Sequence, residues 1–153
     1  MCGIVAVTGY KKALPLLMNG LEKLEYRGYD SAGIAIINSE TNSITCNKAE
    51  GKLKNLKNNL NHENIPGTVG IGHTRWATHG KPEVKNAHPH MDSSGTIAVV
   101  QNGIIENFQD LKNKLQKEGI IFNSDTDTEV IPHLIERELK ILQINNGEAL
   151  QIN

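Results

Sequence analysis

The chain opens with the stretch MCGIVAVTG, residues 1–9, which predicts both a strand and a nucleophile. From Gly3 to Gly9 the residues are small or β-branched and are bounded by glycines, which indicates a short buried strand. Removal of Met1 would leave Cys2 as the N-terminal residue at the beginning of that strand. Cys2 is small, and Met is removed before small residues, so this processing is expected.

An N-terminal cysteine carries a thiol and a free α-amino group on one residue. Unperturbed thiols have a pKa of ~8.5 and α-amino groups one of ~7.7–8.0, so the amine can accept the thiol proton without a histidine. N-terminal Ser, Thr and Cys residues are used in this way as activated nucleophiles. From these first residues alone, an ordinary buried cysteine after a start codon is the alternative interpretation.

The composition is that of a single globular domain without a strong charge bias. The 153 residues include 16 Lys plus Arg and 17 Asp plus Glu, a formal net charge of −1, so no nucleic-acid partner is expected. No apolar run approaches the ~18 residues of a membrane span, and no secretory signal is evident at the N-terminus. Cys2 and Cys46 make a poor disulfide framework, which favours a reducing, cytoplasmic setting.

Hydrophobic spacing predicts both helices and strands along the rest of the chain. We expect helices at 11–25, 52–60, 107–118 and from about 127 onward, and strands at 33–38, 44–49, 68–74 and a buried one at 96–101. Pro15 fits its helix only in the first turn. Thr126 and Glu129 have the spacing of a capping box, and Pro132 predicts a kink or a later start of the last helix.

Residues that could bind a ligand or a metal are most concentrated in HTRWATHG, residues 73–80, and in His88-Pro89-His90. Imidazoles are common metal ligands, so a metal site is one interpretation. There is no HExxH or CxxC pattern, however, and we expect no metal; for His88 and His90, polar residues satisfied by hydrogen bonds are the favoured interpretation. Arg75 follows a strand, and its fork of donors suits a substrate carboxylate.

Two further positions have both a structural and a functional interpretation. Asn102-Gly103 is a common turn signal, but an Asn amide and a Gly backbone N–H can also hold the oxyanion of a tetrahedral intermediate. Asp127 suits either the first turn of a helix, where the helix dipole favours an acid, or the binding of an ammonium group. The local sequence alone favours the structural interpretation of Asp127.

Taken together, these motifs resemble the glutaminase domain of class II, N-terminal-nucleophile (Ntn) glutamine amidotransferases, and among them the glucosamine-6-phosphate synthase branch. The resemblance is colinear up to about residue 140 and is carried by residues 1–5, 25–33, 73–80, 86–90, 102–107 and 126–130. Cys2-Gly-Ile and Asn102-Gly103 would suit any class II amidotransferase, whereas the loop 27–33 and the run 73–80 are much more specific to the glucosamine branch. Amidophosphoribosyltransferases and asparagine synthetases carry different residues at the second of these.

The resemblance implies an α+β fold, the four-layer αββα sandwich of Ntn hydrolases with two mostly antiparallel sheets. Family members continue beyond residue 153, so residues 1–153 are expected to form a partial glutaminase domain that lacks its C-terminal part and the sugar-isomerase domains. Fructose 6-phosphate would bind only to those absent domains, and full-length members are expected to be homo-oligomers. L-Glutamine is the expected partner, with no cofactor.

The resemblance also assigns roles to individual residues. Cys2 would be the nucleophile, with Asn102 and Gly103 as the oxyanion hole and a γ-glutamyl thioester as the intermediate. The residues implied to bind or enclose glutamine are Arg75 at its α-carboxylate, Asp127 at its α-amino group, and Trp76, Thr78 and His79 in a closing loop. Arg27 would orient the N-terminus. A catalytically incomplete glutamine-binding or interaction module is the alternative to glutamine hydrolysis.

Overall fold

The larger of two sheets forms the centre of the structure. The computed structural model describes residues 2–60, 65–76 and 81–151, with side chains placed as far as residue 143. The sheet contains β1 (Gly3–Val7), β2 (Ser31–Asn38), β3 (Ser43–Glu50) and β4 (Gly70–Arg75) in the order β1-β4-β2-β3. All its neighbouring strands are antiparallel, and β2 and β3 form the hairpin that the sequence predicts.

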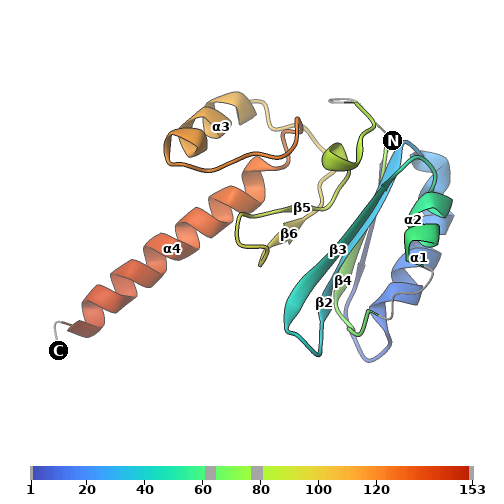
Figure 1. Cartoon of the computed structure of the whole chain (residues 1–153), viewed down its shortest axis with the longest axis horizontal. Coiled ribbons are helices and arrows are strands. Elements are labelled where there is room, and N and C mark those ends of the chain that lie inside the picture. The colour runs from blue at the N-terminus through green and yellow to red at the C-terminus, as the bar shows by residue number, and fades with distance from the viewer. Residues whose placement is uncertain (1, 61–64, 77–80, 152–153) are drawn as a thin grey trace.

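Two helices, α1 (Ala13–Leu24) and α2 (Leu53–Asn59), cover one face of this sheet (Figure 1). Helix α1 packs mainly on β1 and β4, and α2 packs mainly on β3. The core beneath them includes Leu17, Leu21, Ile34, Ile36, Leu53, Leu56 and Leu60. Pro15 lies in the first turn of α1, as predicted, where its missing N–H would have no partner within the helix. Gly20 allows α1 to approach β1 closely, because a Cβ there would lie 2.8 Å from a methyl carbon of Val5.

The other face of the sheet is covered in part by the second half of the chain. The short strands β5 (His90–Met91) and β6 (Ala98–Val99) pair antiparallel, and α3 (Phe108–Lys117) and α4 (Val130–Gln151) lie beyond them (Figure 1). The layers therefore follow the order helices, sheet, sheet, helices, which agrees with the predicted α+β sandwich. Pro132 lies in the first turn of α4, so the helix begins later than residue 127, as the proline predicted.

Two strand predictions need correction. The predicted buried strand at 96–101 is reduced to β6, whose residues are part-exposed, because within the described chain its only strand neighbour is β5. The predicted buried strand at 3–9 ends at Val7 and is an edge strand, because among the described residues it pairs only with β4. Helix α1 covers the face of β1 that carries Gly3 and Val5, whereas the side chain of Ile4 on the other face is 39% exposed.

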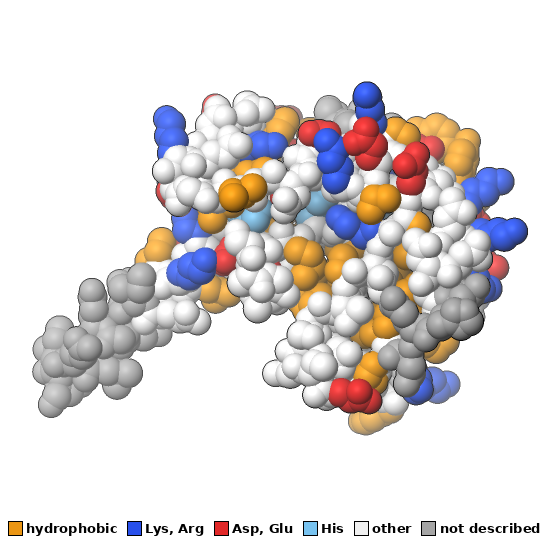
Figure 2. Space-filling view, viewed as in Figure 1, with side chains coloured by type: hydrophobic (Ala, Val, Ile, Leu, Met, Phe, Trp, Pro, Cys, Tyr) orange, Lys and Arg blue, Asp and Glu red, His pale blue; other side chains and the backbone are white. Residues whose placement is uncertain are grey.

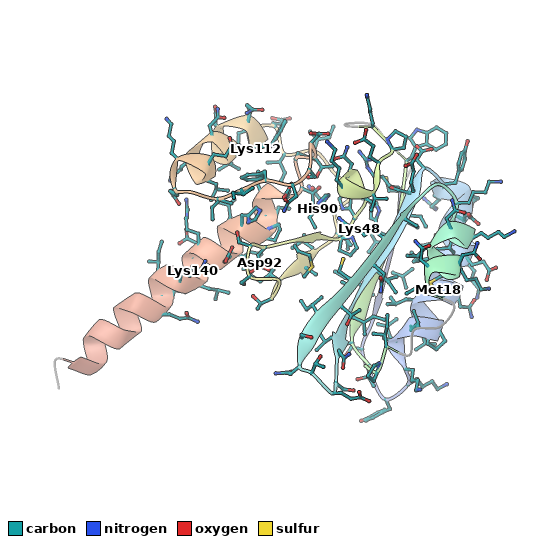
Figure 3. The ribbon with its side chains drawn as sticks, viewed as in Figure 1. Met18, Lys48, His90, Asp92, Lys112 and Lys140 are labelled. Carbon is teal, nitrogen blue, oxygen red and sulfur yellow. The ribbon has the colours of Figure 1, made fainter. Side chains whose placement is uncertain are left out.

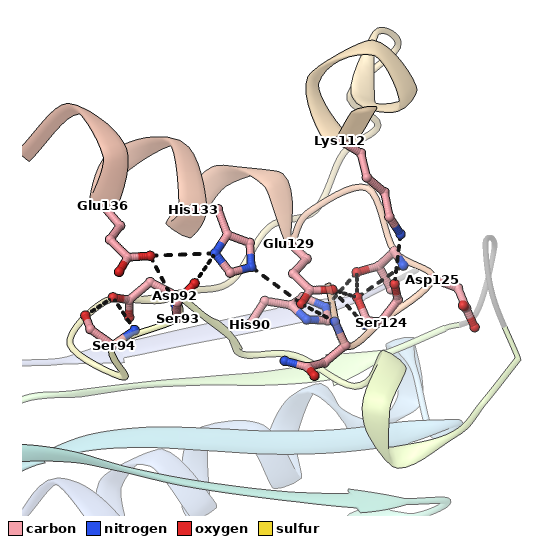
Figure 4. A network of polar contacts seen from close by, with 12 residues as sticks. His90, Asp92, Ser93, Ser94, Lys112, Ser124, Asp125, Glu129, His133 and Glu136 are labelled. Atoms are coloured by element: carbon pink, nitrogen blue, oxygen red, sulfur yellow. Dashed lines mark hydrogen bonds and ion pairs between the residues drawn. The ribbon is translucent and has the colours of Figure 1, made fainter. Parts of the chain in front are cut away.

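The predicted capping box at the start of α4 is also wrong. The Glu129 carboxylate accepts hydrogen bonds from the backbone N–H groups of Asn123 and Ser124, at 2.8 and 2.7 Å, and not from that of Thr126 (Figure 4). Burial alone would raise the pKa of Glu129, but the His133 ring 3.6 Å away and hydrogen bonds from Ser124 and Asn123 lower it to about 2. A charged Glu129 thus ties the loop before α4 to the helix.

None of the helices in the described part of the chain combines the length and the apolar character that a membrane crossing requires.

Candidate active site

The pairing of β1 with β4 places Cys2 beside the end of β4. Gly3 is the register partner of Thr74, so the residue before β1 lies next to the residues that leave β4. The backbone N–H of Trp76 donates to Cys2 Sγ at 3.3 Å, and the thiol lies 3.6 Å from the Trp76 carbonyl oxygen. The candidate nucleophile is therefore held by backbone contacts at one end of the large sheet.

Asn102 reaches the same place from the loop that follows β6. Its amide Nδ2 donates to the carbonyl oxygen of Cys2 at 3.2 Å, and its Oδ1 lies 2.9 Å from Nε2 of His73. Gly103 follows directly and lines the same pocket. The Asn102 amide thus adjoins the candidate nucleophile, and Gly103 shares its pocket.

These residues line a pocket of about 450 Å³, a size that suits a small-molecule ligand. The predicted site residues on its wall are Cys2, Arg27, Arg75, Trp76, Asn102, Gly103 and Asp127. Folding thus brings together every predicted site residue that the structure describes. Thr78 and His79, which were predicted for the closing loop, lie outside the described residues.

Opposite charges face this pocket from two elements. Arg75 at the end of β4 is only 5% exposed, and its Nη1 donates to the carbonyl oxygen of Lys81 at 3.3 Å. Asp127 precedes α4, and its Oδ2 accepts from the backbone N–H of Ile105 at 2.7 Å. A guanidinium and a carboxylate on one pocket wall suit the carboxylate and ammonium groups of a free amino acid.

The loop between α1 and β2 packs against the end of β4, and this close approach requires a glycine at position 28. A Cβ on Gly28 would lie 2.7 Å from the carbonyl carbon of Arg75, so only glycine fits there without movement. Asp30 donates its backbone N–H to the Arg75 carbonyl oxygen at 3.0 Å, and the ring of Tyr29 meets that of Trp76 edge-on at 5.4 Å. The predicted role of Arg27 toward the N-terminus stays a prediction.

Several pocket residues were not predicted as site residues: His73, His88, Gln101, Ile104, Thr126 and Thr128. Four of them could have been predicted from their neighbours in the sequence: Gln101 and Ile104 flank Asn102-Gly103, and Thr126 and Thr128 flank Asp127. His73 stands two residues before Arg75 on β4, and side chains at i and i+2 of a strand share a face. His88 had no such signal, since only the fold carries its segment over the sheet.

His73, His88 and His90 form a buried group of rings, called the histidine stack below. The rings of His73 and His88 lie parallel with centroids 4.3 Å apart, and His90 meets His88 edge-on at 4.6 Å. Burial lowers the pKa of His73 to about 4 and that of His90 to about 3, and nearby Lys48 opposes protonation of His90 (Figure 3). His90 shares a hydrogen bond of 2.8 Å with Thr126, and His88 Nδ1 accepts one from the Gln101 N–H at 3.4 Å. The interpretation of His88 and His90 as hydrogen-bonded polar residues is therefore confirmed.

Among the residues that the structure describes, no three His, Cys, Asp or Glu side chains are placed to hold a metal ion.

Comparison with known proteins identifies the relatives of this chain. The pattern of a glutamine amidotransferase domain matches residues 36–147. Glutamine–fructose-6-phosphate aminotransferase (isomerizing) of Thermosynechococcus vestitus is 57% identical over 147 residues, 96% of this chain and 23% of the relative. The protein of that name from Gloeobacter violaceus is 60% identical over 136 residues, 88% of this chain and 22% of the relative.

Solved structures show the same fold. The glutamine phosphoribosylpyrophosphate amidotransferase of B. subtilis, in complex with ADP and GMP, matches with a TM-score of 0.73 and 31% identity, over 90% of this chain and 29% of that one. A structure described as the allosteric regulatory enzyme of purine biosynthesis matches with a TM-score of 0.76 and 31% identity, over 90% of this chain and 30% of that one. The chain spans less than a quarter of the length of the curated relatives named above.

Proposed function

The chain belongs to the glutamine amidotransferase domain family, and on that premise we propose that it hydrolyses the side-chain amide of L-glutamine. One observation carries the proposal: the Cys2 thiol, the Asn102 amide and the opposite charges of Arg75 and Asp127 line a single pocket. In this proposal residues 1–153 are part of a class II glutaminase domain, and Cys2 becomes the N-terminal residue once Met1 is removed.

The charged residues orient the substrate in this proposal. Arg75 offers two parallel N–H donors to the α-carboxylate of glutamine, and Asp127 accepts from its α-ammonium group. The Asp127 oxygen bonded to Ile105 still has a free lone pair, and its second oxygen is a further acceptor. With both groups on the α-carbon held, the side-chain amide at the other end of glutamine extends toward Cys2.

The first half-reaction forms a thioester. The α-amino group of Cys2 accepts the thiol proton while Sγ bonds to the amide carbon, and the carbonyl electron pair becomes an oxyanion. Asn102 Nδ2 and the Gly103 N–H donate to that oxyanion. Collapse of the intermediate breaks the C–N bond, and the α-ammonium group returns its proton to the leaving nitrogen, which departs as ammonia.

The second half-reaction restores the thiol. The α-amino group accepts a proton from water as the water oxygen attacks the γ-glutamyl thioester. The C–S bond then breaks, the thiolate regains the proton, and glutamate leaves. In the longer proteins that carry this domain, we propose that the ammonia serves the conversion of fructose 6-phosphate to glucosamine 6-phosphate, as the names of the relatives suggest. A reactive thiol of this kind fits a reducing compartment such as the cytoplasm.

The test is covalent trapping of the nucleophile. After intact-mass measurement to establish loss of Met1, the chain is treated with the glutamine analogue diazo-oxo-norleucine, and the adduct is located by peptide mass spectrometry. We expect one adduct on Cys2, none in Cys2→Ala, and glutamate release from glutamine that Cys2→Ala abolishes. Cys46→Ala is the matched control, because Cys46 lies on β3 outside the pocket and its replacement should leave both readouts unchanged.

Two results would contradict the proposal in different ways. Equal loss of activity in Cys2→Ala and Cys46→Ala would mean that the nucleophile is misplaced. Saturable glutamine binding without any Cys2 adduct or glutamate release would instead identify a glutamine-binding module that performs no chemistry.

A further inference from the structure

The side chain of His73 contacts Asn102 of the candidate oxyanion hole directly, although the proposed reaction gives His73 no task. It lies on β4 with only 1% of its surface exposed, and its Nε2 is 2.9 Å from Oδ1 of Asn102. The two residues are 29 positions apart in sequence, so this contact depends on the packing of the second half of the chain over the sheet.

The carbonyl oxygen of Cys2 settles which way the Asn102 amide faces. In the observed orientation Nδ2 donates to that oxygen at 3.2 Å. If the amide were turned over, Oδ1 would face the same carbonyl oxygen, and two acceptors would repel each other. Oδ1 therefore faces His73, and the proton of the His73 ring must be on Nε2, because an oxygen can only accept.

The surroundings of His73 suit a neutral donor fixed in one orientation. The His88 ring stacks on it at 4.3 Å with an interplanar angle of 16°, and Nδ1 of His73 is buried without a partner among the described residues. Burial is the main reason that the pKa of His73 falls to about 4. At neutral pH the ring is then uncharged, with its one N–H directed at Asn102.

The contact between His73 and Asn102 matters for the proposed reaction because the Asn102 amide nitrogen carries a second proton. An amide NH₂ has two donors, and the bond to Cys2 uses one of them. The other is available to an oxyanion formed at Cys2. Without a donor on Oδ1 only the single bond to the Cys2 carbonyl oxygen opposes rotation of the amide. The turned orientation is then populated more often, and it would present an acceptor to the developing negative charge.

We propose that His73 is a positioning residue for the oxyanion hole, and that its Nε2–H holds the Asn102 amide in the orientation that donates to the oxyanion. The inference rests on the proposed glutaminase function of the same pocket. It assigns no proton transfer to His73, which acts only through Asn102.

The kinetic test uses His73→Phe, which keeps a stacked ring and removes the donor. Removing an oxyanion-hole donor costs ~10²–10³ in kcat, and a misoriented donor costs less, so we expect kcat for glutamine hydrolysis to fall about 10-fold. KM should change less than about threefold, because the oxyanion exists only beyond the ground state. His73→Gln, which can place an amide N–H near the position of Nε2, should recover most of the loss.

A double-mutant cycle separates positioning from a general effect on folding. In the Asn102→Ala background there is no amide left to orient, so adding His73→Phe should lower kcat less than about twofold. A further 10-fold loss in that background would overturn the proposal. His90→Phe is the matched control, because His90 belongs to the same buried stack but bonds to Thr126 and not to Asn102, and it should keep kcat within about twofold.

A spectroscopic readout keeps this inference distinguishable from the proposed function. Long-range ¹H–¹⁵N NMR spectra at pH 7 should show His73 as the neutral Nε2–H tautomer, in the natural chain and in Cys2→Ala, which performs no chemistry. A proton on Nδ1 alone, or a charged ring, would overturn the positioning role. Absence of any Cys2 adduct alongside the expected tautomer would instead refute the glutaminase function.

Discussion

The backbone N–H of Trp76 donates to the sulfur of Cys2 at 3.3 Å, although 74 residues separate them in the sequence. The contact follows from the register of β1 on β4, in which Gly3 is opposite Thr74. Arg75 stands between Thr74 and Trp76, so a single strand pairing fixes the distance between the candidate nucleophile and the residue proposed to hold the substrate carboxylate. In the proposed function, substrate binding and chemistry therefore depend on the same end of the large sheet.

Arg75→Lys should weaken glutamine binding more than it slows the chemical step. Lysine keeps the positive charge but lacks the planar pair of donors that matches a carboxylate. We expect KM for glutamine to rise about 10-fold with kcat within about threefold, measured by steady-state glutamate release. Arg137→Lys, at a surface ion pair with Glu138, is the control and should change neither constant. An unchanged KM in Arg75→Lys would remove Arg75 from the substrate site.

Gly33→Ala should destabilise the fold strongly. Gly33 lies on β2 under the segment that carries the histidine stack, and a Cβ there would lie 2.2 Å from the carbonyl oxygen of His88. Because backbone must move, we expect a loss of roughly 1–3 kcal/mol or more in the free energy of unfolding, measured by urea denaturation. Gly20→Ala is the matched comparison and should cost less, because its Cβ meets the Val5 side chain and alanine favours a helix. Equal stability of Gly33→Ala and the natural chain would contradict this packing.

Acid should destabilise the protein between about pH 6.5 and pH 4. Unfolded histidines have a pKa near ~6.5, whereas burial lowers the pKa of His73 to about 4 and of His90 to about 3. In that window the unfolded state binds more protons, so the free energy of unfolding falls as pH falls. Lys48 and Arg75 face the stack and oppose its protonation, while Glu129 favours it. Each histidine contributes up to ~1.4 kcal/mol per pH unit.

Urea titrations at pH 7, 6 and 5 measure this effect. Glu129, with its pKa lowered to about 2, loses its contribution only below its unfolded value near ~4.5, so the upper part of the window isolates the histidines. His90→Asn can keep a hydrogen bond to Thr126. It should reduce the slope of the unfolding free energy against pH by the amount that corresponds to about one bound proton. A stability that is constant from pH 7 to pH 5 would show that the buried rings are already charged or exposed.

The isolated chain should associate through the apolar surface that faces the gap between α4 and the large sheet. Figure 2 shows hydrophobic side chains beside the recess between α4 and the large sheet. Leu139 and Leu142 on α4 are 47% and 57% exposed, and Ile37 on β2 and Val69 just before β4 are 43% and 41% exposed. Exposed apolar patches of this kind favour protein contacts. Sedimentation velocity should show self-association that rises with concentration. A glutamate-release assay should show a glutaminase turnover below that of longer relatives.

Charged substitutions on α4 provide the control for association. Leu139→Lys combined with Leu142→Lys should shift the chain toward monomer without changing the pocket, because both residues lie outside it. The prediction would be refuted if the chain stays monomeric at high concentration, melts cooperatively and has full turnover. The exposed apolar surface would then not mediate self-association.

The sequence by itself determined the local elements and most candidate chemistry. The leucines of 11–25 and 52–60 repeat at helical spacing, and the hairpin at 33–49 has β-branched strands around a polar turn, so short-range patterns were sufficient. Cys2, Asn102, Arg75 and Asp127 were identified by residue type and by resemblance. The extent of the strands was predicted less well, because pairing at an edge and burial depend on neighbours that are distant in sequence.

Only the tertiary structure decided how these residues act on one another. Glu129 has the spacing of a capping box with Thr126, yet its carboxylate binds the N–H groups of Asn123 and Ser124, because the loop before α4 folds back over it. His73 stood in a conspicuous run of polar residues without an assigned role, and it meets Asn102 only because β4 and the loop after β6 converge. Hydrogen bonds between distant segments depend on a geometry of about an ångström, which local propensity and hydrophobic period do not contain.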